Sequence, residues 1–586
     1  MTDGWERDLS SIGPSDWTPE RARHLLDRAG FGGPPEEVAR LAAMSPEAAV
    51  AWFIDFKTND VGNLPPFEHS GIYDSSLTPF PPTRPAATRL AAETGTAMGV
   101  DAKPTGPRRL QPVADRFFFW LRASMLETRR VANWWADRMV ATSRPLEEKL
   151  ALFWHGHFAS SEEKVRDYRK MLGQIQLFQK HAIGNFGTLL SSVARDPAML
   201  VYLDAGQNLK VHPNENFGRE LMELFTMGIG HYTEQDIREA ARAFTGWIDK
   251  DLSFHIDDAQ HDSGNKTVLG YTGPLDGQDV LDIILAQPAT ASFIASKLYR
   301  FLVRDDLSPQ FQERLGDLLR SGKYEIAPFL RTVFLSRDFY SVASVGTHIK
   351  GPVELIVSTY RRLGLGSTPG MPDFNSASTE LGQTLLNPPT VAGWSQDRAW
   401  ITPGSLLARG NFARAVLLPD VIAFTDPNLD PYPVQLRAFS ARIRAGEDIT
   451  TASKIADGAD GKEPQRSGMA TANLLSAHEE FNTHYASLKG WEEAVRRVKP
   501  TLRRAAQFSL TTIVLEGNAR SAAQAVDTLI ARFLSVPLDP ENRDAAVTFL
   551  ETELGTKDLD RAKTYLEEPL RLTAHLIMST PQYQLA

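Results

Sequence analysis

Residues 131–140, VANWWADRMV, and residues 146–154, LEEKLALFW, decide the fold class of this chain. In both stretches the apolar residues recur at three- and four-residue spacing, which is the period of an α-helix with one buried face. The same spacing recurs in further segments, namely 117–125, 171–183, 280–285, 289–303, 311–319, 326–334 and 353–363. The pattern predicts an all-α protein, built as one large multi-helix domain.

The N-terminal part is expected to differ from this helical region in the length of its helices and in its content of proline and glycine. Residues 1–58 should hold two short helices, because Thr18 and Ser45 each stand as an N-cap before a proline at the first helical position. Residues 59–112 are rich in proline and glycine, which exclude a regular helix or a central strand. We expect a long loop there, with a lid as one role for it.

Residues 113–586 are predicted to form the main helical domain. Within it, residues 252–256 and 267–271 alternate between apolar and polar side chains and flank a polar stretch. This alternation predicts a minor two-stranded β insertion near 252–271, as a small hairpin or a pair of loop strands.

Composition narrows the classes of function. The chain of 586 residues carries 72 acidic and 63 basic side chains, a formal net charge of −9, so nucleic acid is not an expected partner. It has no cysteine, so any metal must be held by His, Asp or Glu. The sequence contains no run of about 18 consecutive apolar residues, which is the length that a membrane-spanning helix requires. The acidic N-terminus does not resemble a signal peptide, so the sequence as given is either cytoplasmic or trimmed, and its location stays open.

The segment 214–225, NENFGRELMELF, is the first candidate site. On a helix its apolar residues form a buried stripe, and Asn216, Glu220 and Glu223 fall on one flank, with Glu220 closest to the stripe. A carboxylate at the edge of a buried face must be paired, protonated or bound to a cation. An ion-pair ladder of Glu215, Arg219 and Glu223 is the structural alternative, but it leaves Glu220 unexplained.

A second candidate lies at the end of the helix that begins near residue 146. His155 and His157 are aromatic-flanked, and on an intact helix they point about 200° apart. If Gly156 ends the helix between them, both rings could face one zinc, manganese or iron ion. Buried, hydrogen-bonded histidines are the alternative interpretation.

Two loops complete the candidates. His261 and Asp262 lie on a glycine-containing turn, which either presents catalytic groups or is a solvated hairpin loop. Residues 387–400 contain Trp394 and Trp400, which could stack on a sugar ring, wall a pocket or plug the end of the bundle. P-loop, dinucleotide-binding, Gly-x-Ser-x-Gly and His-Glu-x-x-His motifs are missing from the sequence.

In these same stretches the chain resembles a bacterial family catalogued as domain of unknown function 1800. The resemblance runs through 22–32, 153–158, 214–228, 232–247, 261–270, 387–400 and 578–584. It implies a single large helical domain, and members of the family are often exported and found beside sulfatase-like proteins. The family supplies no reaction, so it assigns no catalytic residue, and this chain departs from it in having no visible export signal.

Three functions stay open from the sequence. The first is a hydrolase acting on a carbohydrate or another polymer, with Glu220 as the acid and Asp262 as the second group, helped by Glu223 and His261. Its substrate-binding residues would be Trp154, Trp247, Trp394, Trp400, Arg219 and Asn216. The second is a metal-dependent hydrolase or oxidase with His155 and His157 as ligands of a divalent metal. The third is a non-catalytic binding or scaffold partner of a neighbouring hydrolase, and the resemblance implies a sulfatase-like protein as that partner.

Overall fold

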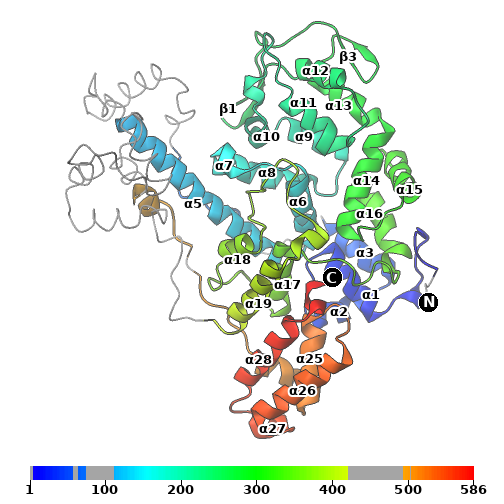
Figure 1. Ribbon diagram of the computed structural model, residues 1–586, viewed down its shortest axis with the longest axis vertical. Helices are drawn as coiled ribbons and strands as arrows, with labels where there is room; N and C mark the ends of the chain where they lie inside the picture. Colours follow the sequence, from blue (N-terminus) through cyan, green and yellow to red (C-terminus); the bar gives the residue numbers. More distant parts are fainter. Residues whose placement is uncertain (1–3, 57–63, 74–110, 420–491, 502) are drawn as a thin grey trace. The chain divides into compact units, whose positions relative to one another are not determined.

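The computed structural model describes residues 4–56, 64–73, 111–419, 492–501 and 503–586 (Figure 1). Within these residues the chain is mostly α-helical, and its strands form two separate two-stranded sheets. The predicted fold class, mostly helical with a minor β insertion, is therefore confirmed. None of the helices in the described ranges combines the length and the apolar character that crossing a membrane requires.

The chain divides into two compact units. Unit 1 consists of Met1–Pro65, Ala132–Ile422 and Arg503–Ala586, and unit 2 of Pro66–Val131 and Ala423–Leu502. Of the predicted loop 59–112, residues 64–73 are described and contain no helix or strand, and residues 111 and 112 already belong to a helix. The other residues of that loop lie outside the described ranges, and its role as a lid stays a prediction. The predicted domain boundaries at 58 and 112 stay predictions as well.

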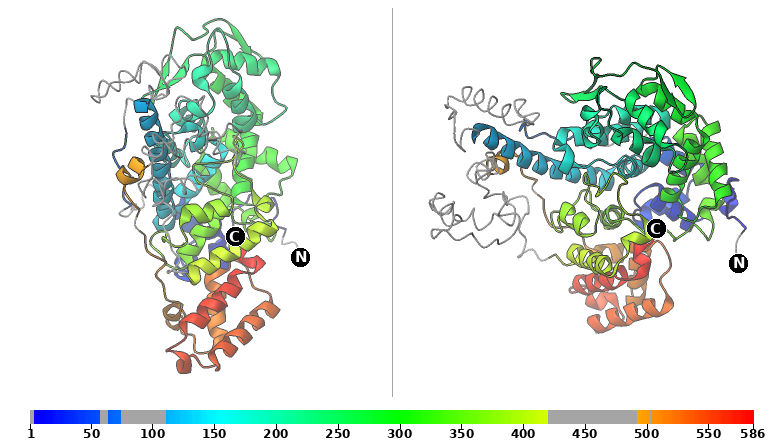
Figure 2. Two further views of the ribbon diagram at one scale, coloured as in Figure 1. Left: turned by 60° about the vertical axis from the view of Figure 1, so that its left-hand side comes forward. Right: turned by 45° about the horizontal axis from the view of Figure 1, so that its top comes forward.

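The helices of the first half of the chain are the following: α1 (Pro19–Ala29), α2 (Pro35–Ala42), α3 (Pro46–Ile54), α5 (Gln111–Ala141), α6 (Pro145–His157), α7 (Glu162–Val165), α8 (Tyr168–His181), α9 (Phe186–Ala194), α10 (Pro197–Tyr202), α11 (Asn216–Glu220), α12 (Glu234–Ala243) and α13 (Gly277–Ala286). The second half adds α14 (Pro288–Leu302), α15 (Pro309–Ser321), α16 (Ile326–Leu335), α17 (Pro352–Arg362), α18 (Phe374–Glu380), α19 (Pro403–Leu417), α24 (Leu510–Glu516), α25 (Ala522–Phe533), α26 (Pro540–Leu554), α27 (Leu559–Ala562) and α28 (Glu567–Met578). In both views of Figure 2 the helices α25, α26 and α28, coloured orange to red, gather into one group, and they pack on one another.

Local capping signals place α1 and α3 where the sequence predicts them, whereas α2 between them was not predicted, so the described residues of 1–58 hold three α-helices and not two. The Thr18 side chain accepts a hydrogen bond from the Arg21 amide at the start of α1, and Ser45 accepts one from Ala48 at the start of α3. The fixed φ angle of proline suits the first helical position, so both helices begin at the proline after the cap.

The β insertion consists of two hairpins rather than one. The strand β1 (Trp247–Lys250) pairs antiparallel with β2 (Ser253–Ile256), and β3 (Lys266–Val268) pairs with β4 (Tyr271–Gly273). The two predicted strand segments therefore do not pair with each other, because each finds a nearer partner across a tight turn.

In unit 2, a hydrogen bond links the first part of α5 to the stretch around Ser70. Glu127 of α5 accepts a hydrogen bond from the Ser70 amide at 2.8 Å and pairs with Arg130 at 2.6 Å. The Glu127 side chain is fully buried, so both partners are needed to compensate for its lost hydration.

Candidate functional site

A pocket in unit 1 brings together side chains from five stretches that are far apart in the sequence. It is lined by Leu152, Phe153 and Gly156 of α6, by Arg300, Phe301, Arg304 and Asp305 at the end of α14, by Thr347, His348, Gly351 and Glu354 at the start of α17, by Gln383, and by Trp394, Ser395, Gln396, Asp397 and Trp400. Its cavity has a volume of about 80 Å³ and is open to solvent. A concave site with a few polar groups among aromatic walls is the usual form of a small-molecule site.

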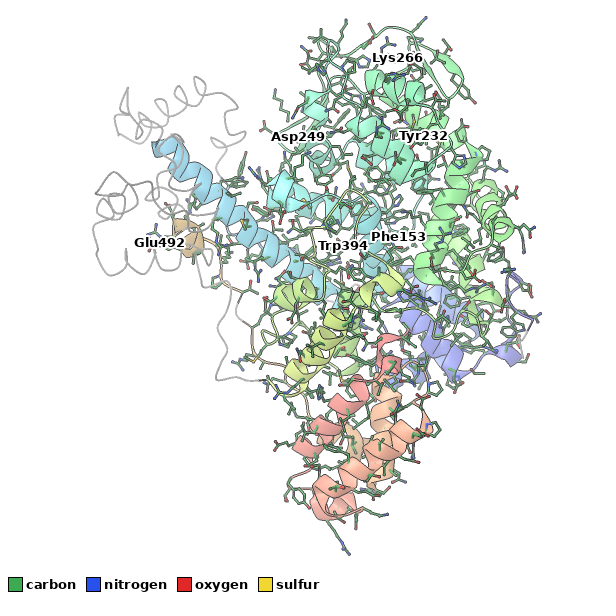
Figure 3. All side chains as sticks on the ribbon, in the orientation of Figure 1. Phe153, Tyr232, Asp249, Lys266, Trp394 and Glu492 are labelled. Carbon is green, nitrogen blue, oxygen red and sulfur yellow. The ribbon has the colours of Figure 1, made fainter. Side chains whose placement is uncertain are left out.

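Aromatic side chains make the walls of this aromatic pocket. Trp394 and Trp400 keep 9% and 8% of their surfaces exposed, and both line it, as the sequence predicted for one of their roles. Figure 3 shows Trp394 next to Phe153 of α6, and Phe153 in turn packs on Phe301 with ring centroids 5.1 Å apart. Within the described residues neither indole N–H of the two tryptophans donates a hydrogen bond, so both donors are available to a ligand.

The tryptophan loop is held against α6 by a close approach of two glycines. Gly393 has φ +87°, and a Cβ atom built on it would lie 2.1 Å from the carbonyl oxygen of Gly156. Only glycine combines this backbone conformation with this approach. Trp394 follows directly, and its ring packs edge-on against His155 at 5.0 Å.

Gly393→Ala is expected to displace the loop and to lower the free energy of unfolding by about 1–3 kcal/mol, because the methyl group and the positive φ are both unfavourable. Urea denaturation measures the loss, and the intrinsic tryptophan emission should shift as Trp394 becomes exposed. The matched control is Gly230→Ala, which also has a positive φ but has no atom within 4 Å of the added Cβ. Equal effects of the two variants would show that contact with Gly156 does not hold the loop.

A histidine–glutamate pair forms the polar part of the pocket wall. His348 Nε2 lies 3.0 Å from Glu354 Oε2, and only 10% of the histidine side chain and 8% of the glutamate side chain are exposed. Glu354 is the third residue of α17, and its Oε2 also accepts the Gly351 amide at 2.7 Å, which is the glutamate half of a capping box. The helix start therefore fixes the carboxylate that faces His348.

Glu354 also belongs to a buried ionic network. The Lys149 ammonium from α6 donates to Glu354 Oε1 and lies 5.1 Å above the ring of Phe31. Burial by itself would raise the pKa of Glu354, but the charges of Lys149 and Arg28 and the hydrogen bond from His348 together outweigh it, and the pKa lies well below its ordinary value. Glu354 is therefore a carboxylate at neutral pH.

The charge state of His348 follows from its surroundings. Burial lowers its pKa to about 4, and the nearby charge of Arg28 acts in the same direction. The imidazole is neutral at pH 7, and because an ionised carboxylate can only accept, Nε2 must carry the proton and donate it to Glu354. Nδ1 then holds a free lone pair, and it makes no hydrogen bond with any described residue.

Two further carboxylates, Asp305 and Asp397, line the same pocket. Asp397 begins the 3₁₀-helical turn Asp397–Trp400 with φ +47°, an unusual value for a residue with a side chain. It is half-buried, and among the described residues it makes no hydrogen bond or ion pair. This leaves its oxygens available to accept hydrogen bonds from a ligand.

The carboxylates predicted at 214–225 lie elsewhere in unit 1. Burial and the neighbouring Glu223 raise the pKa of half-buried Glu220. Glu223 accepts a hydrogen bond from Tyr232 at 2.9 Å, and Figure 3 shows Tyr232 well apart from Phe153 and Trp394. Neither Glu220 nor Glu223 lines the aromatic pocket.

The predicted helix in this segment also changes its geometry. α11 ends at Glu220, and residues Leu221–Thr226 continue as a π-helix, in which the turn is wider. Met222 is buried, whereas Leu224, expected in the buried stripe, is only half-buried. The stripe predicted from an ideal α-helical period is therefore confirmed at Phe217, Leu221 and Phe225 and wrong at Leu224.

Arg219 and Asn216 lie at the surface of this segment. Arg219 pairs with Glu215 at 3.0 Å and with Glu234 at 2.7 Å, whereas Glu223 is not part of the predicted ladder. Asn216 is exposed, and its amide donates to the Asn214 side chain. Like Glu220, both residues lie outside the aromatic pocket.

The two histidines of α6 do not face one point. Gly156 lies inside α6, which continues through His157, so the predicted break between them is wrong. His155 accepts the Leu386 amide at 3.1 Å, and His157 lies 3.0 Å from the Phe225 carbonyl oxygen. Both rings are buried among aromatic side chains, and burial lowers both pKa values to about 3. In the described part of the chain, no three His, Asp or Glu side chains are grouped so as to hold a metal ion.

The remaining predicted residues have structural partners. His261 Nδ1 lies 2.9 Å from the Thr245 carbonyl oxygen, and Asp262 pairs with Arg242 at 2.8 Å. Burial alone would raise the pKa of Asp262, but the hydrogen bond from Arg242 lowers it. Trp154 and Trp247 are buried in the core and do not line the aromatic pocket, and their role in substrate binding stays a prediction.

Sequence reasoning missed His348, Glu354, Lys149 and Arg300. Gly351, Pro352 and Glu354 do carry a local signal, the start of a capped helix, which would have placed the carboxylate at a helix N-terminus. The pairing of Glu354 with Lys149 has no such signal, because the two residues are 205 positions apart.

Comparison with known proteins identifies the family. A protein-family model described as "Protein of unknown function (DUF1800)" matches residues 24–585, which is nearly the whole chain. The chain belongs to this family, as the resemblance noted from the sequence implied. A search of curated proteins finds no match, and a search of solved structures finds none either.

Proposed function

We propose that this protein is a hydrolase that acts on a carbohydrate in the aromatic pocket. The observation that carries the proposal is the His348–Glu354 pair, a neutral imidazole oriented by a buried carboxylate, in the wall of a pocket with two tryptophans. Indole faces suit the apolar faces of sugar rings, and a carboxylate-oriented histidine is a general base.

The arrangement supports a simple proton cycle. His348 Nδ1 takes a proton from a water molecule, whose oxygen bonds to the electrophilic carbon of the substrate as the bond to the leaving oxygen breaks. The imidazolium that forms is stabilised by Glu354 and then returns the proton to the leaving oxygen. Since the pKa of His348 is about 4, the base is available down to about that pH. Asp397 and the two indole N–H groups would hold the hydroxyl groups of the sugar.

The test compares the new site with the one predicted from the sequence. The full chain is incubated with a panel of oligosaccharides, and cleavage is followed by chromatography. His348→Gln should lower the rate about 100-fold or more, the usual contribution of a general base, whereas Glu220→Gln, a matched half-buried carboxylate outside the pocket, should leave it unchanged. Loss of cleavage in Glu220→Gln alone would move the catalytic centre to α11.

A non-catalytic carbohydrate-binding protein is the second candidate. The observation that favours it is the saturation of Glu354, whose two oxygens already accept hydrogen bonds from Lys149, His348 and the Gly351 amide. Binding of a saccharide in the pocket without cleavage, lost in Trp394→Ala, would support this function. A sulfatase-like partner stays a prediction, since it rests on the resemblance alone.

A further inference from the structure

We propose that the substrate of the aromatic pocket carries a protonated amine, the ammonium group of an amino sugar, and that Asp397 recognises it beside the two tryptophans. This inference rests on the proposed function, because it names the substrate class of the same pocket. It follows from the pairing of the charged side chains in the pocket wall and from the position of Asp397 in the tryptophan loop.

The charged side chains of the pocket wall are paired, with one exception. Those that line the pocket are Arg300, Arg304, Asp305, Glu354 and Asp397. Arg300 lies 3.6 Å from Asp305, and Arg304 pairs at 2.7 Å with Asp338, which is outside the wall. Glu354 pairs with Lys149. Asp397 makes neither a hydrogen bond nor an ion pair with any described residue, so its negative charge is the one left uncompensated in this wall.

The two cations nearest to this carboxylate do not compensate it. Arg398 follows Asp397 directly, but its side chain is exposed and does not line the pocket. Arg28 is buried and donates to two backbone carbonyl oxygens of α14. Its charge interacts more strongly with Glu354 and Asp27 than with Asp397. A ligand is therefore the partner that Asp397 lacks.

Asp397 stands in the middle of the aromatic part of the pocket. It begins the turn Asp397–Trp400 with φ +47°, a conformation that aspartate and asparagine adopt more readily than other side chains do. Trp394 and Trp400 lie three residues before and three residues after it, and all three residues line the pocket. An ammonium group donates strong hydrogen bonds to a carboxylate and is attracted by indole rings within about 6 Å. A hydroxyl group can also donate to Asp397, but it brings no charge to compensate the carboxylate.

The test is isothermal titration calorimetry of the full chain at pH 6 and low salt, because salt screens interactions between charges. The probes are a chitosan oligosaccharide, whose amines are largely protonated at this pH, and its neutral N-acetylated counterpart of equal length. Methylammonium separates an amino sugar from any small cation. We expect the cationic oligosaccharide to bind about tenfold more tightly than the neutral one.

Two variants assign this preference to one carboxylate. Asp397→Asn should abolish the preference, because asparagine keeps the shape of the side chain and tolerates the positive φ but carries no charge. The matched control is Glu380→Gln, which removes one negative charge from an exposed position of α18 outside the pocket and should retain the full preference. Circular dichroism checks that both variants are folded, and the comparison of the two sugars in the original chain does not depend on either.

The outcomes separate this inference from the proposed function. Equal binding of the two oligosaccharides by the original chain, or a preference that survives Asp397→Asn, overturns the inference and leaves the hydrolase proposal standing. Methylammonium binding as tightly as the cationic oligosaccharide overturns the assignment to a sugar, and loss of the preference in Glu380→Gln overturns the assignment to Asp397. If neither oligosaccharide binds but another sugar of the hydrolysis panel is cleaved, the inference alone is wrong. If no sugar binds or is cleaved, the proposed function is wrong as well.

Discussion

Glu354→Gln is expected to lower the free energy of unfolding of unit 1 by about 3–5 kcal/mol, the usual cost of removing one partner from a buried ion pair. The substitution keeps the shape of the side chain, so the change isolates the charge. Lys149, buried between the rings of Phe31 and Phe301, would lose its carboxylate and retain the full cost of desolvation. Urea denaturation at pH 7, followed by circular dichroism, measures the difference.

Two further variants make this prediction specific. Lys149→Met combined with Glu354→Gln should recover most of the lost stability, because replacing both partners of a buried pair is often neutral. Glu234→Gln removes an exposed partner of Arg219 and should leave the stability unchanged within error. A Glu354→Gln variant as stable as the original chain would show that the network does not stabilise the fold.

Acid is expected to destabilise unit 1 steeply between pH 6.5 and pH 4. Burial lowers the pKa of His24, His155 and His157 to about 3 and that of His348 to about 4. In this window the unfolded chain binds a proton at each of these four histidines and the native chain does not, so unfolding is favoured as the pH falls.

Two buried acids act in the opposite direction. Burial raises the pKa values of Glu147 and Asp196 to about 7, so the native chain binds their protons over the same window and gains stability as the pH falls. Four histidines against two acids leave a net uptake of two protons on unfolding. The stability should therefore fall by roughly 2.7 kcal/mol per pH unit, at 1.36 kcal/mol for each proton.

Denaturation at pH 6, 5.5 and 5 tests this slope. His155→Gln should reduce it by about half, to roughly 1.4 kcal/mol per pH unit, because it removes one of the two net protons. The control is His231→Gln, at an exposed position, which should leave the slope unchanged. Equal slopes for both variants would show that burial of His155 does not govern the acid response.

The features that the sequence predicts correctly depend on neighbouring residues. The N-cap and proline at Thr18 and Ser45 place two helices, and apolar spacing gives the helical class, because both signals lie within one or two turns of the chain. Strand alternation in 252–256 is equally local, but the choice of partner strand is not, and the sequence left it open between one hairpin and a pair of loop strands. The aromatic loop at Trp394 was recognised as a candidate pocket wall for its residue types alone.

The polar part of the site could not be predicted in the same way. His348 is a single histidine in a polar stretch, and its importance comes from Glu354, Lys149 and Arg28, which only the fold brings near it. Glu220 attracted attention because a helical projection places it beside an apolar stripe, but such a projection says nothing about whether a pocket faces that flank. Whether a residue belongs to a functional site depends on its burial and on the charged groups around it. Both are set by the tertiary structure.

The distance in sequence between Lys149 and Glu354 also bears on how the protein folds. Forming a contact between two residues that are 205 positions apart costs more chain entropy than forming a local helix. Proteins rich in such contacts fold slowly. The pocket should therefore form late, after α6, α14 and α17 have docked. A fragment that ends before Trp394 would lack one of the pocket walls, so limited proteolysis that separates these helices should abolish ligand binding even where helical content survives.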